Sequence, residues 1–457
     1  SNHYNSWVRS SRYVSMPDGI KIAVDIIQPA VNGIVSKKKL PAIVMQTPYQ
    51  RAFIKPNGSV GSQIERHAWQ GLVEHGYVFV IFAARGTAAS FGRYTMPVSQ
   101  KERNDAKNVI EWLAKQPYSN GKIGMMGDSY QGLVQFMAVA THPKHLKAIF
   151  AETSPFDFYQ LIYPGGIFRS SFLTYWAHEV EQMNLLNQLV PVDNDPNGRL
   201  LMQAREAHKI NLDVLEQFRK IPYTDQTTKY FSWKKNNPAN FISQINNAHI
   251  PVYISDSWYD VFSSDALFWY TNLAENKKML IGAWPHNTYN APTEIRNERE
   301  TINNAEALRW FNYWLKGIKN HIMQEPKIHY TVIDQDYHNG RWYSSNQWPV
   351  KGIHLTAWNL NTKHTLTRNE PTTHANDSYA ANYTTSTGHF SRWNNANGAG
   401  FINYSGLTLN DKKSLTYTSP PLSHNITIIG FPLLTLSLSS NTIDTDIHAV
   451  LESIDKN

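Results

Sequence analysis

An α/β fold built on a mostly parallel sheet is predicted for this chain by three features of its sequence. Short apolar runs bounded by turn residues recur through the first 150 residues and return after residue 250. Segments with helical periodicity lie between several of these runs. Strands that alternate with helices are typical of a parallel sheet covered on both faces. The third feature is a stretch from 156 to 247 that lacks such runs and interrupts the alternation.

The apolar runs have the length and the β-branched content of buried strands. They are KIAVDII, PAIVMQ, YVFVIFAA, KIGMMG and KAIFAE in the first part, and PVYIS and KMLIGA in the second. A helix is predicted in ERNDAKNVIEWLAKQ, where the spacing i, i+3, i+4 and i+7 forms one apolar stripe of Ala106, Val109, Ile110 and Leu113. Another helix is expected to end at Gly76, just before YVFVIFAA. In open sheets of this kind, ligands bind beyond the carboxyl ends of the strands.

Two or three domains are expected from a length of 457 residues. Residues 1–155 and 248–322 form the two parts of the α/β domain, and 156–247 form a helical cap inserted between them. Residues 323–457 read as a β-sandwich domain because β-rich runs there are separated by Asn, Thr, Gly and Pro. Its predicted strands are IHYTVI, GIHLTAWNL, SLTYTS and FPLLTLSLSS.

The composition is that of a folded globular protein, with 41% hydrophobic and 12% aromatic residues. The net charge of +7 is spread along the chain, so we expect no nucleic-acid partner. No apolar run approaches the roughly 20 residues that span a bilayer, so no membrane segment is expected. The absence of cysteine excludes thiol nucleophiles, disulfides and cysteine metal sites. The first residues, SNHYNSW, carry no apolar leader, so the protein is cytoplasmic, or exported with its signal peptide removed.

The stretch GMMGDSYQGLVQ, residues 124–135, places Ser129 between a predicted strand and a predicted helix. A nucleophilic serine on such a turn needs small neighbours, because the chain reverses with strained dihedral angles. Gly127 lies two residues before the serine, but Gln131 occupies the usual place of the second glycine, and Gly132 follows it. The alternative interpretation is an ordinary strand-to-helix loop.

An acid and a histidine should follow later in the chain, each at the end of a strand. Asp256 and Asp260 follow PVYIS, and His286 follows KMLIGA. In such a triad the acid orients the imidazole, and the imidazole takes the serine proton. The alternative for His286, one of 18 histidines, is an ordinary surface residue.

These residues resemble the CocE/NonD hydrolases, a family that includes cocaine esterase, glutaryl acylases, α-amino acid ester hydrolases and X-Pro dipeptidyl peptidases. The stretch GDSYQG fits the family pattern G-x-S-Y-x-G, which accounts for the displaced glycine. The other matching motifs follow in the family's order: MPDGIKIAVDI, TPYQR, RGTAASFG, EWLAKQPYSNGKIG, SWYDVF, GAWPH, RWFNYWLKG and the stretch from LTYTSPPLSHNITIIG to TDIHAVL. The resemblance covers nearly the whole chain and implies an α/β-hydrolase fold with an inserted helical cap and a C-terminal jelly-roll, which here looks incomplete.

The resemblance implies a catalytic triad of Ser129, Asp260 and His286. Asp260 is preferred to Asp256 because it fills the acid position of the W-Y-D-x-F pattern. The resemblance also implies an oxyanion hole whose two donors are the backbone N–H of Tyr130 and the hydroxyl of Tyr49. Tyr49 follows the run PAIVMQ, so it is also expected at the active edge of the sheet on position alone. Its alternative role is that of a packing aromatic.

Two departures from the family pattern affect the expected contacts. The family places an acid two residues before the arginine of RGTAASFG, where this chain has Ala83, so the resemblance leaves the ion-pair partner of Arg85 open. The amino-ester hydrolases place carboxylates just after the catalytic acid to bind an α-ammonium group. Here the stretch VFSS, residues 261–264, contains none, so a substrate held by a free α-amino group is less expected.

The sequence therefore predicts a serine hydrolase that cleaves a small-molecule ester or amide through an acyl-enzyme, with no metal or organic cofactor. The alternatives are an X-Pro dipeptidyl-peptidase, a hydrolase-fold protein that binds a ligand without catalysis, and a β-sandwich protein that binds carbohydrate. The candidate pocket walls are aromatic residues that could equally belong to the core: Phe168, Tyr175, Trp176 and Trp258. A second copy of the chain or a further segment is expected to complete the β domain.

Overall fold

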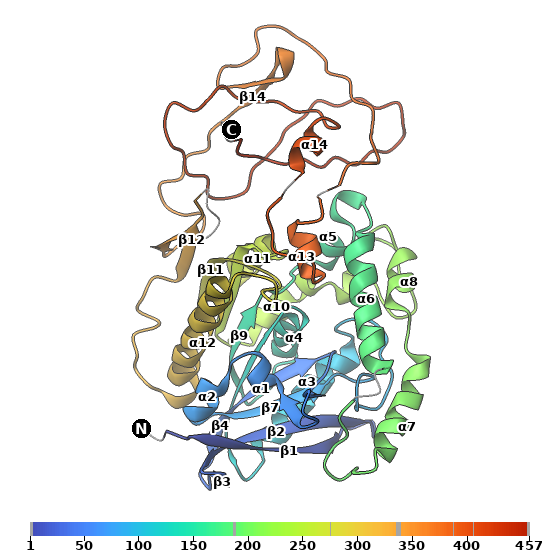
Figure 1. The fold of residues 1–457 in the computed structure, drawn as a ribbon, viewed down its shortest axis with the longest axis vertical. Coiled ribbons are helices and arrows are strands. Elements are labelled where there is room, and N and C mark those ends of the chain that lie inside the picture. The colour runs from blue at the N-terminus through green and yellow to red at the C-terminus, as the bar shows by residue number, and fades with distance from the viewer. Residues whose placement is uncertain are drawn as a thin grey trace.

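The computed structural model describes residues 3–185, 189–274, 276–334, 340–386, 388–404 and 406–454. Its centre is a twisted sheet that runs in the order β1-β2-β7-β4-β8-β9-β10-β11-β12-β13, with β3 paired to β2 (Figure 1). The strands are β1 (Ser6–Ser15), β2 (Lys21–Val31), β3 (Ile34–Val35), β4 (Leu40–Thr47), β7 (Val78–Ala83), β8 (Ser119–Asp128), β9 (Leu146–Glu152), β10 (Val252–Tyr259), β11 (Lys277–Pro285), β12 (Ile328–Val332) and β13 (Arg341–Ser345). A separate hairpin joins β5 (Ala52–Ile54) and β6 (Val60–Ser62).

The middle of the sheet is parallel, as predicted. Every pair from β7 through β4, β8, β9, β10 and β11 to β12 is parallel. Antiparallel pairs occur at the edges, between β1 and β2, β2 and β7, and β12 and β13. All residues of β4 and β7 are buried, as expected for strands covered on both faces.

Helices cover both faces of the sheet and divide the core into two clusters. On β7, Val80 and Phe82 point to one face, and Phe79 and Ile81 point to the other. The first face is covered by α3 (Gln100–Ala114), α4 (Tyr130–Val139) and α11 (Ser263–Asn272). The second is covered by α1 (Gln63–Arg66), α2 (Gln70–Glu74) and α12 (Thr293–Lys316). The predicted stripe of α3, Ala106, Val109, Ile110 and Leu113, is completely buried.

Helices alone connect β9 to β10 among the described residues, apart from one isolated bridge between Thr227 and Ser232. They are α5 (Phe158–Ile162), η1 (Pro164–Gly166), α6 (Ser170–Leu185), α7 (Arg199–Ala207), η2 (His208–Ile210), α8 (Val214–Arg219), α9 (Trp233–Asn236), η3 (Pro238–Phe241) and α10 (Ile242–Asn247). Figure 1 shows α6, α7 and α8 along one side of the molecule, against the sheet domain. This region corresponds to the predicted cap, whose exact boundaries stay predictions.

The region after α12 differs from the expected β-sandwich. The run IHYTVI forms β12, but β12 and β13 extend the central sheet although they lie beyond residue 322. Further elements are β14 (Asn359–Asn361), η4 (Thr362–His364), β15 (Thr365–Thr367), α13 (Arg392–Ala396) and α14 (Leu407–Asp411). The remainder is drawn as long irregular segments above the sheet domain (Figure 1).

Two strands predicted in this region, at 414–419 and 431–440, are not strands in the structure, and of the predicted strand at 352–360 only the last two residues belong to one, β14. Thr418 forms one isolated bridge with Thr365, and residues 431–440 have no ladder partner among the described residues. Alternating Leu and Ser favours a strand, but a strand needs a neighbour to pair its backbone groups. The jelly-roll therefore stays a prediction.

Candidate active site

Ser129 occupies the sharp turn between β8 and α4. Its backbone angles, φ 58° and ψ −123°, belong to a region that residues with a side chain rarely adopt. The strained residue is held by its own N–H, which donates to the Glu152 carbonyl at 3.0 Å and to Thr153 Oγ1 at 3.1 Å. Both acceptors lie at the end of the neighbouring strand β9 or just after it. The strain and its support are what a nucleophile turn requires.

The position of the second glycine has a steric cause. A Cβ atom at Gly132 would lie 2.2 Å from Ser154 Oγ and 2.4 Å from the Glu152 carbonyl oxygen. Helix α4 therefore packs against the end of β9 too closely for any side chain at this position. Gly127 is required as well, since its φ is 151° and a Cβ there would lie 2.7 Å from Gln131 Cβ.

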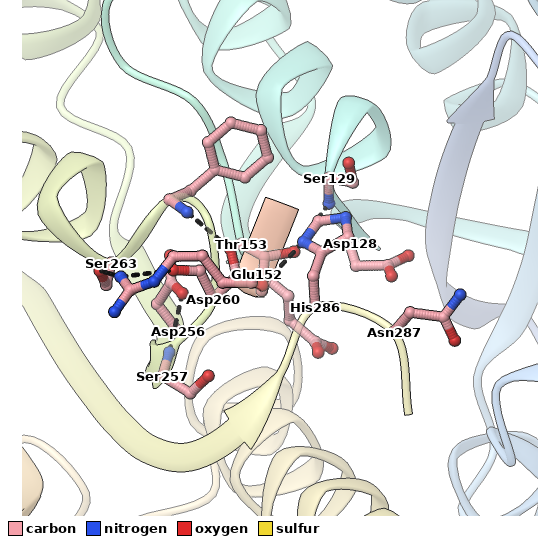
Figure 2. Close-up of polar contacts among 12 residues, drawn as sticks. Asp128, Ser129, Glu152, Thr153, Asp256, Ser257, Asp260, Ser263, His286 and Asn287 are labelled. Carbon is pink, nitrogen blue, oxygen red and sulfur yellow. Dashed lines mark hydrogen bonds and ion pairs between the residues drawn. The ribbon is translucent and has the colours of Figure 1, made fainter. Parts of the chain in front are cut away.

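Asp260 and His286 follow the ends of β10 and β11 and form a hydrogen bond. His286 Nδ1 and Asp260 Oδ2 are 2.7 Å apart, and the Asp260 side chain is completely buried. The other carboxylate oxygen, Asp260 Oδ1, accepts from the Phe262 N–H at 2.7 Å. In the close-up the imidazole lies between Asp260 and Ser129 (Figure 2). Because Nδ1 faces the carboxylate, Nε2 is the nitrogen left to exchange a proton with a serine hydroxyl.

Electrostatics favour the charged form of His286. Burial opposes a charged imidazole, but the attraction and hydrogen bond of Asp260 outweigh it, so the pKa of His286 lies above its usual value. Asp256, the other acid considered from the sequence, is also buried and accepts from the Ser257 N–H at 2.7 Å. Burial and the neighbouring charge of Asp260 raise the pKa of Asp256 well above its usual range. The carboxylate that contacts His286 is thus that of Asp260.

Arg299 of α12 links the loops that carry these groups. Its Nη1 donates to the His286 carbonyl at 2.9 Å, while Nη2 lies 3.5 Å from Asp128 Oδ2 and 3.7 Å from Glu152 Oε2. One turn later on the same helix face, Asn303 donates to Glu152 Oε2 at 2.9 Å. Sequence reasoning missed Arg299, because it lies within a helix and not at a strand end.

The two expected oxyanion-hole residues lie on neighbouring strand ends. Tyr49 follows β4, and its backbone N–H donates to Thr47 Oγ1, which also accepts from Gln131 Nε2 of α4 at 3.0 Å. Tyr130 is the first residue of α4, so its backbone N–H has no acceptor within the helix. These two positions therefore offer an N–H and a phenolic O–H as donors.

The Tyr130 side chain is fixed beneath the site by buried polar groups. Its hydroxyl donates to the Glu102 carboxylate at 2.8 Å and accepts from the Val98 N–H at 3.0 Å, with the Tyr94 hydroxyl also at 3.0 Å. Burial raises the pKa of Glu102 to about 7, although the Tyr130 hydroxyl hydrogen bond acts in the opposite sense. These contacts hold the first turn of α4, and so the Tyr130 N–H, in place.

The four aromatic residues proposed as pocket walls make different contacts, and their role as walls stays a prediction. Trp176 of α6 reaches the site, where its Nε1 donates to the Tyr49 hydroxyl at 3.0 Å. Its neighbour Tyr175 is partly exposed and donates to Glu179 at 3.0 Å. Phe168 packs within the cap against Tyr163.

The fourth aromatic, Trp258 on β10, faces the edge of the sheet. Its indole N–H donates to the Thr331 carbonyl of β12 at 2.6 Å, and its ring lies 6.3 Å from that of Trp348. These contacts tie Trp258 to the strand that extends the central sheet.

A segment of the C-terminal region contacts both of the loops that carry Asp260 and His286. Asn395 of α13 is completely buried, accepts from the Asn287 N–H and donates to the Asn287 carbonyl, each at 3.0 Å. Asn287 directly follows the catalytic-histidine candidate. Arg392 Nη1 donates to the Asp260 carbonyl at 3.3 Å. No motif in the sequence signalled this segment.

The partner of Arg85, which the resemblance left open, comes from two other segments. Arg85 forms bidentate contacts with Asp105 of α3, at 2.7 and 2.8 Å, and its Nη1 lies 2.7 Å from Asp18 Oδ2. Asp105 and Asp18 thus supply carboxylates in place of the one that the family has at the position of Ala83.

Within the described residues, no group of three or more His, Asp or Glu side chains is placed to hold a metal ion. Nor does any helix of the described chain combine the length and apolar character needed to cross a bilayer.

Comparison with known proteins connects this geometry to a family. The model of the X-Pro dipeptidyl-peptidase (S15 family) matches residues 18–288, and that of the X-Pro dipeptidyl-peptidase C-terminal non-catalytic domain matches residues 320–457. A Mycobacterium bovis protein named as a serine esterase is 27% identical over 99% of this chain and 79% of its own length. Cocaine esterase of a Rhodococcus species is 24% identical over 78% of this chain and 62% of its own length.

The fold is shared with solved structures. A CocE/NonD family hydrolase from Staphylococcus aureus superposes with a TM-score of 0.62 at 22% identity, over 80% of this chain and 61% of that one. The chain thus spans less than two thirds of that structure. The S15 match alone covers more than half of the chain and contains Ser129, Asp260 and His286. The chain therefore belongs to the X-Pro dipeptidyl-peptidase S15 family of serine hydrolases.

Proposed function

We propose that this chain hydrolyses small carboxylic esters by acyl transfer, with Ser129 as the nucleophile. The proposal is carried by the strained turn at Ser129, taken together with the hydrogen bond between the buried Asp260 and His286. A serine at such a turn presents its hydroxyl above the sheet edge, where the imidazole of a later strand end can reach it.

In the proposed reaction, His286 Nε2 takes the Ser129 hydroxyl proton as the serine oxygen attacks the substrate carbonyl carbon. The tetrahedral oxyanion is stabilised by the Tyr130 N–H and the Tyr49 O–H. His286 then returns the proton to the leaving alcohol as the acyl-enzyme forms. Water, activated by the same imidazole, releases the acid and restores Ser129. Asp260 holds the imidazole in the required tautomer and stabilises its charged form.

A second candidate, cleavage of X-Pro peptides, is favoured by the family match to residues 18–288. The stretch after Asp260 argues against a free amino terminus as the anchor, since residues 261–264 contain no carboxylate. A ligand-binding protein with an inactive triad is the remaining alternative, and it predicts no covalent reaction at Ser129.

The test is exposure to a fluorophosphonate, followed by peptide mapping, for the wild-type protein and Ser129→Ala. We expect one adduct, on Ser129, and none in the variant. Hydrolysis of p-nitrophenyl esters and of an X-Pro dipeptide p-nitroanilide then separates the two enzymatic candidates. A folded wild-type protein that forms no adduct and hydrolyses neither substrate would contradict the proposal.

A further inference from the structure

We propose that Trp176 is a positioning residue that orients the Tyr49 hydroxyl and thereby completes the oxyanion hole from the cap. This inference rests on the proposed function. A single side chain of α6 contacts both oxyanion-hole residues. The Trp176 Nε1–H donates to the Tyr49 oxygen at 3.0 Å, and the indole stacks on the Tyr130 ring with a centroid distance of 6.1 Å and an interplanar angle of 18°.

The direction of the Trp176–Tyr49 hydrogen bond is fixed by chemistry. An indole N–H can only donate, so the phenolic oxygen of Tyr49 is the acceptor. The single hydrogen of Tyr49 then points away from Trp176 and is free to bind an oxyanion. Without the indole N–H, the hydroxyl could rotate, and its hydrogen could turn away from the reacting carbonyl.

Accepting this bond also makes the hydroxyl a stronger donor. A hydroxyl oxygen that accepts a hydrogen bond is polarised and donates its own hydrogen more strongly. Burial raises the pKa of Tyr49, whereas the Trp176 bond acts in the opposite sense. The bond therefore offsets part of the loss of acidity that burial imposes on the donor.

The stacking contact supports the second donor. The Tyr130 hydroxyl is held on its far side by Glu102, Tyr94 and Val98, and the indole packs on the ring from the cap side. Tyr49 and Tyr130 belong to the sheet domain, while Trp176 belongs to the inserted helices. The oxyanion hole is therefore complete only when α6 is seated on the sheet domain.

The experiment compares Trp176→Phe with Trp233→Phe. Phenylalanine keeps a stacking ring but removes the N–H. Trp233 is a matched control, because it is a buried indole of the same cap whose N–H donates to the Ile221 carbonyl at 3.1 Å, within the cap. For Trp176→Phe we expect kcat for a p-nitrophenyl ester to fall by about 3- to 10-fold, the effect of one hydrogen bond, with KM within about twofold. Trp233→Phe should lower the melting temperature but leave kcat unchanged.

A double-mutant cycle with Tyr49→Phe tests the route of the effect. Tyr49→Phe alone should lower kcat by about 10²- to 10³-fold, and adding Trp176→Phe should then cause no further loss. The inference is overturned if Trp176→Phe keeps the wild-type kcat, changes KM alone, or costs the same factor in the Tyr49→Phe background. If Trp176→Phe fails to fold, β-(3-benzothienyl)alanine at 176, an isostere without the N–H, gives the same test. Labelling of Ser129 by fluorophosphonate separates the outcomes, since a wild-type protein that is not labelled contradicts the proposed function itself.

Discussion

Replacing Gly132 by alanine should damage the nucleophile turn more than its size suggests. The added Cβ would lie 2.2 Å from Ser154 Oγ, which can rotate, and 2.4 Å from the Glu152 carbonyl oxygen, which cannot. Ordinary contact begins at 3.4 Å, so α4 and the end of β9 would have to separate by about 1 Å. That same carbonyl accepts the Ser129 N–H. The shift therefore reaches the proposed nucleophile, Ser129, directly.

We expect Gly132→Ala to lose about 1–3 kcal/mol of unfolding free energy and about 10²-fold in kcat/KM. Urea unfolding and ester hydrolysis measure the two effects. Gly71→Ala is the matched control, since Gly71 lies in α2 and its added Cβ would meet nothing within 4 Å. That variant should be neutral or stabilised by up to about 1 kcal/mol, with full activity. A Gly132→Ala enzyme with wild-type stability and kcat/KM would refute the packing argument.

Three further predictions concern the histidine loop. Because Asp260 raises the pKa of His286 above 6.5, wild-type kcat/KM should fall as pH decreases through that raised pKa. In Asp260→Asn this acidic limb of the pH–rate profile should move to lower pH, and kcat should fall about 10⁴-fold. An acidic limb that does not move would contradict the prediction. By linkage, the contribution of the Asp260–His286 pair to stability is complete below pH 6.5 and is lost as pH rises through the raised pKa of His286. Thermal unfolding measured at several pH values would detect this loss. The aspartate of Asn395→Asp cannot donate to the Asn287 carbonyl. This variant should lose about 1–3 kcal/mol of unfolding free energy in urea and should also have a lower kcat. Unchanged values of both would show that the contact does not position His286.

The sequence could predict the strand-end residues because parallel strands bring their carboxyl ends to one edge. Ser129, Asp260 and His286 each follow an apolar run, but position alone left both Asp256 and Asp260 open, and the family pattern W-Y-D-x-F was needed to prefer Asp260. Asp260 and His286 follow neighbouring parallel strands, and the hydrogen bond between them forms because those strands end at the same edge of the sheet.

Groups supplied by helices and distant segments could not be found in this way. Arg299 lies in the long helix α12, and only the packing of that helix beneath the sheet brings it to His286 and Glu152. The partners of Arg85 come from a turn before β2 and from α3, so no local pattern around Ala83 could reveal them. The alternating run at 431–440 misled for a related reason, since alternation reports a strand's two faces but not whether a partner strand is present.

The contacts of α13 bear on how the two family regions cooperate. Asn395 and Arg392 lie within the match to a domain described as non-catalytic, yet they bind the backbone at Asn287 and Asp260. Trp393 extends the link to the cap, since its ring packs edge-on against Phe172 of α6. The same helix carries Trp176, so contacts connect α6, the loops of Asp260 and His286, and the α13 segment. Because the Asn395 side chain is buried and hydrogen-bonded to the Asn287 backbone, opening the segment would leave those Asn287 groups without this partner. Its ordering and that of the active site should therefore be energetically coupled.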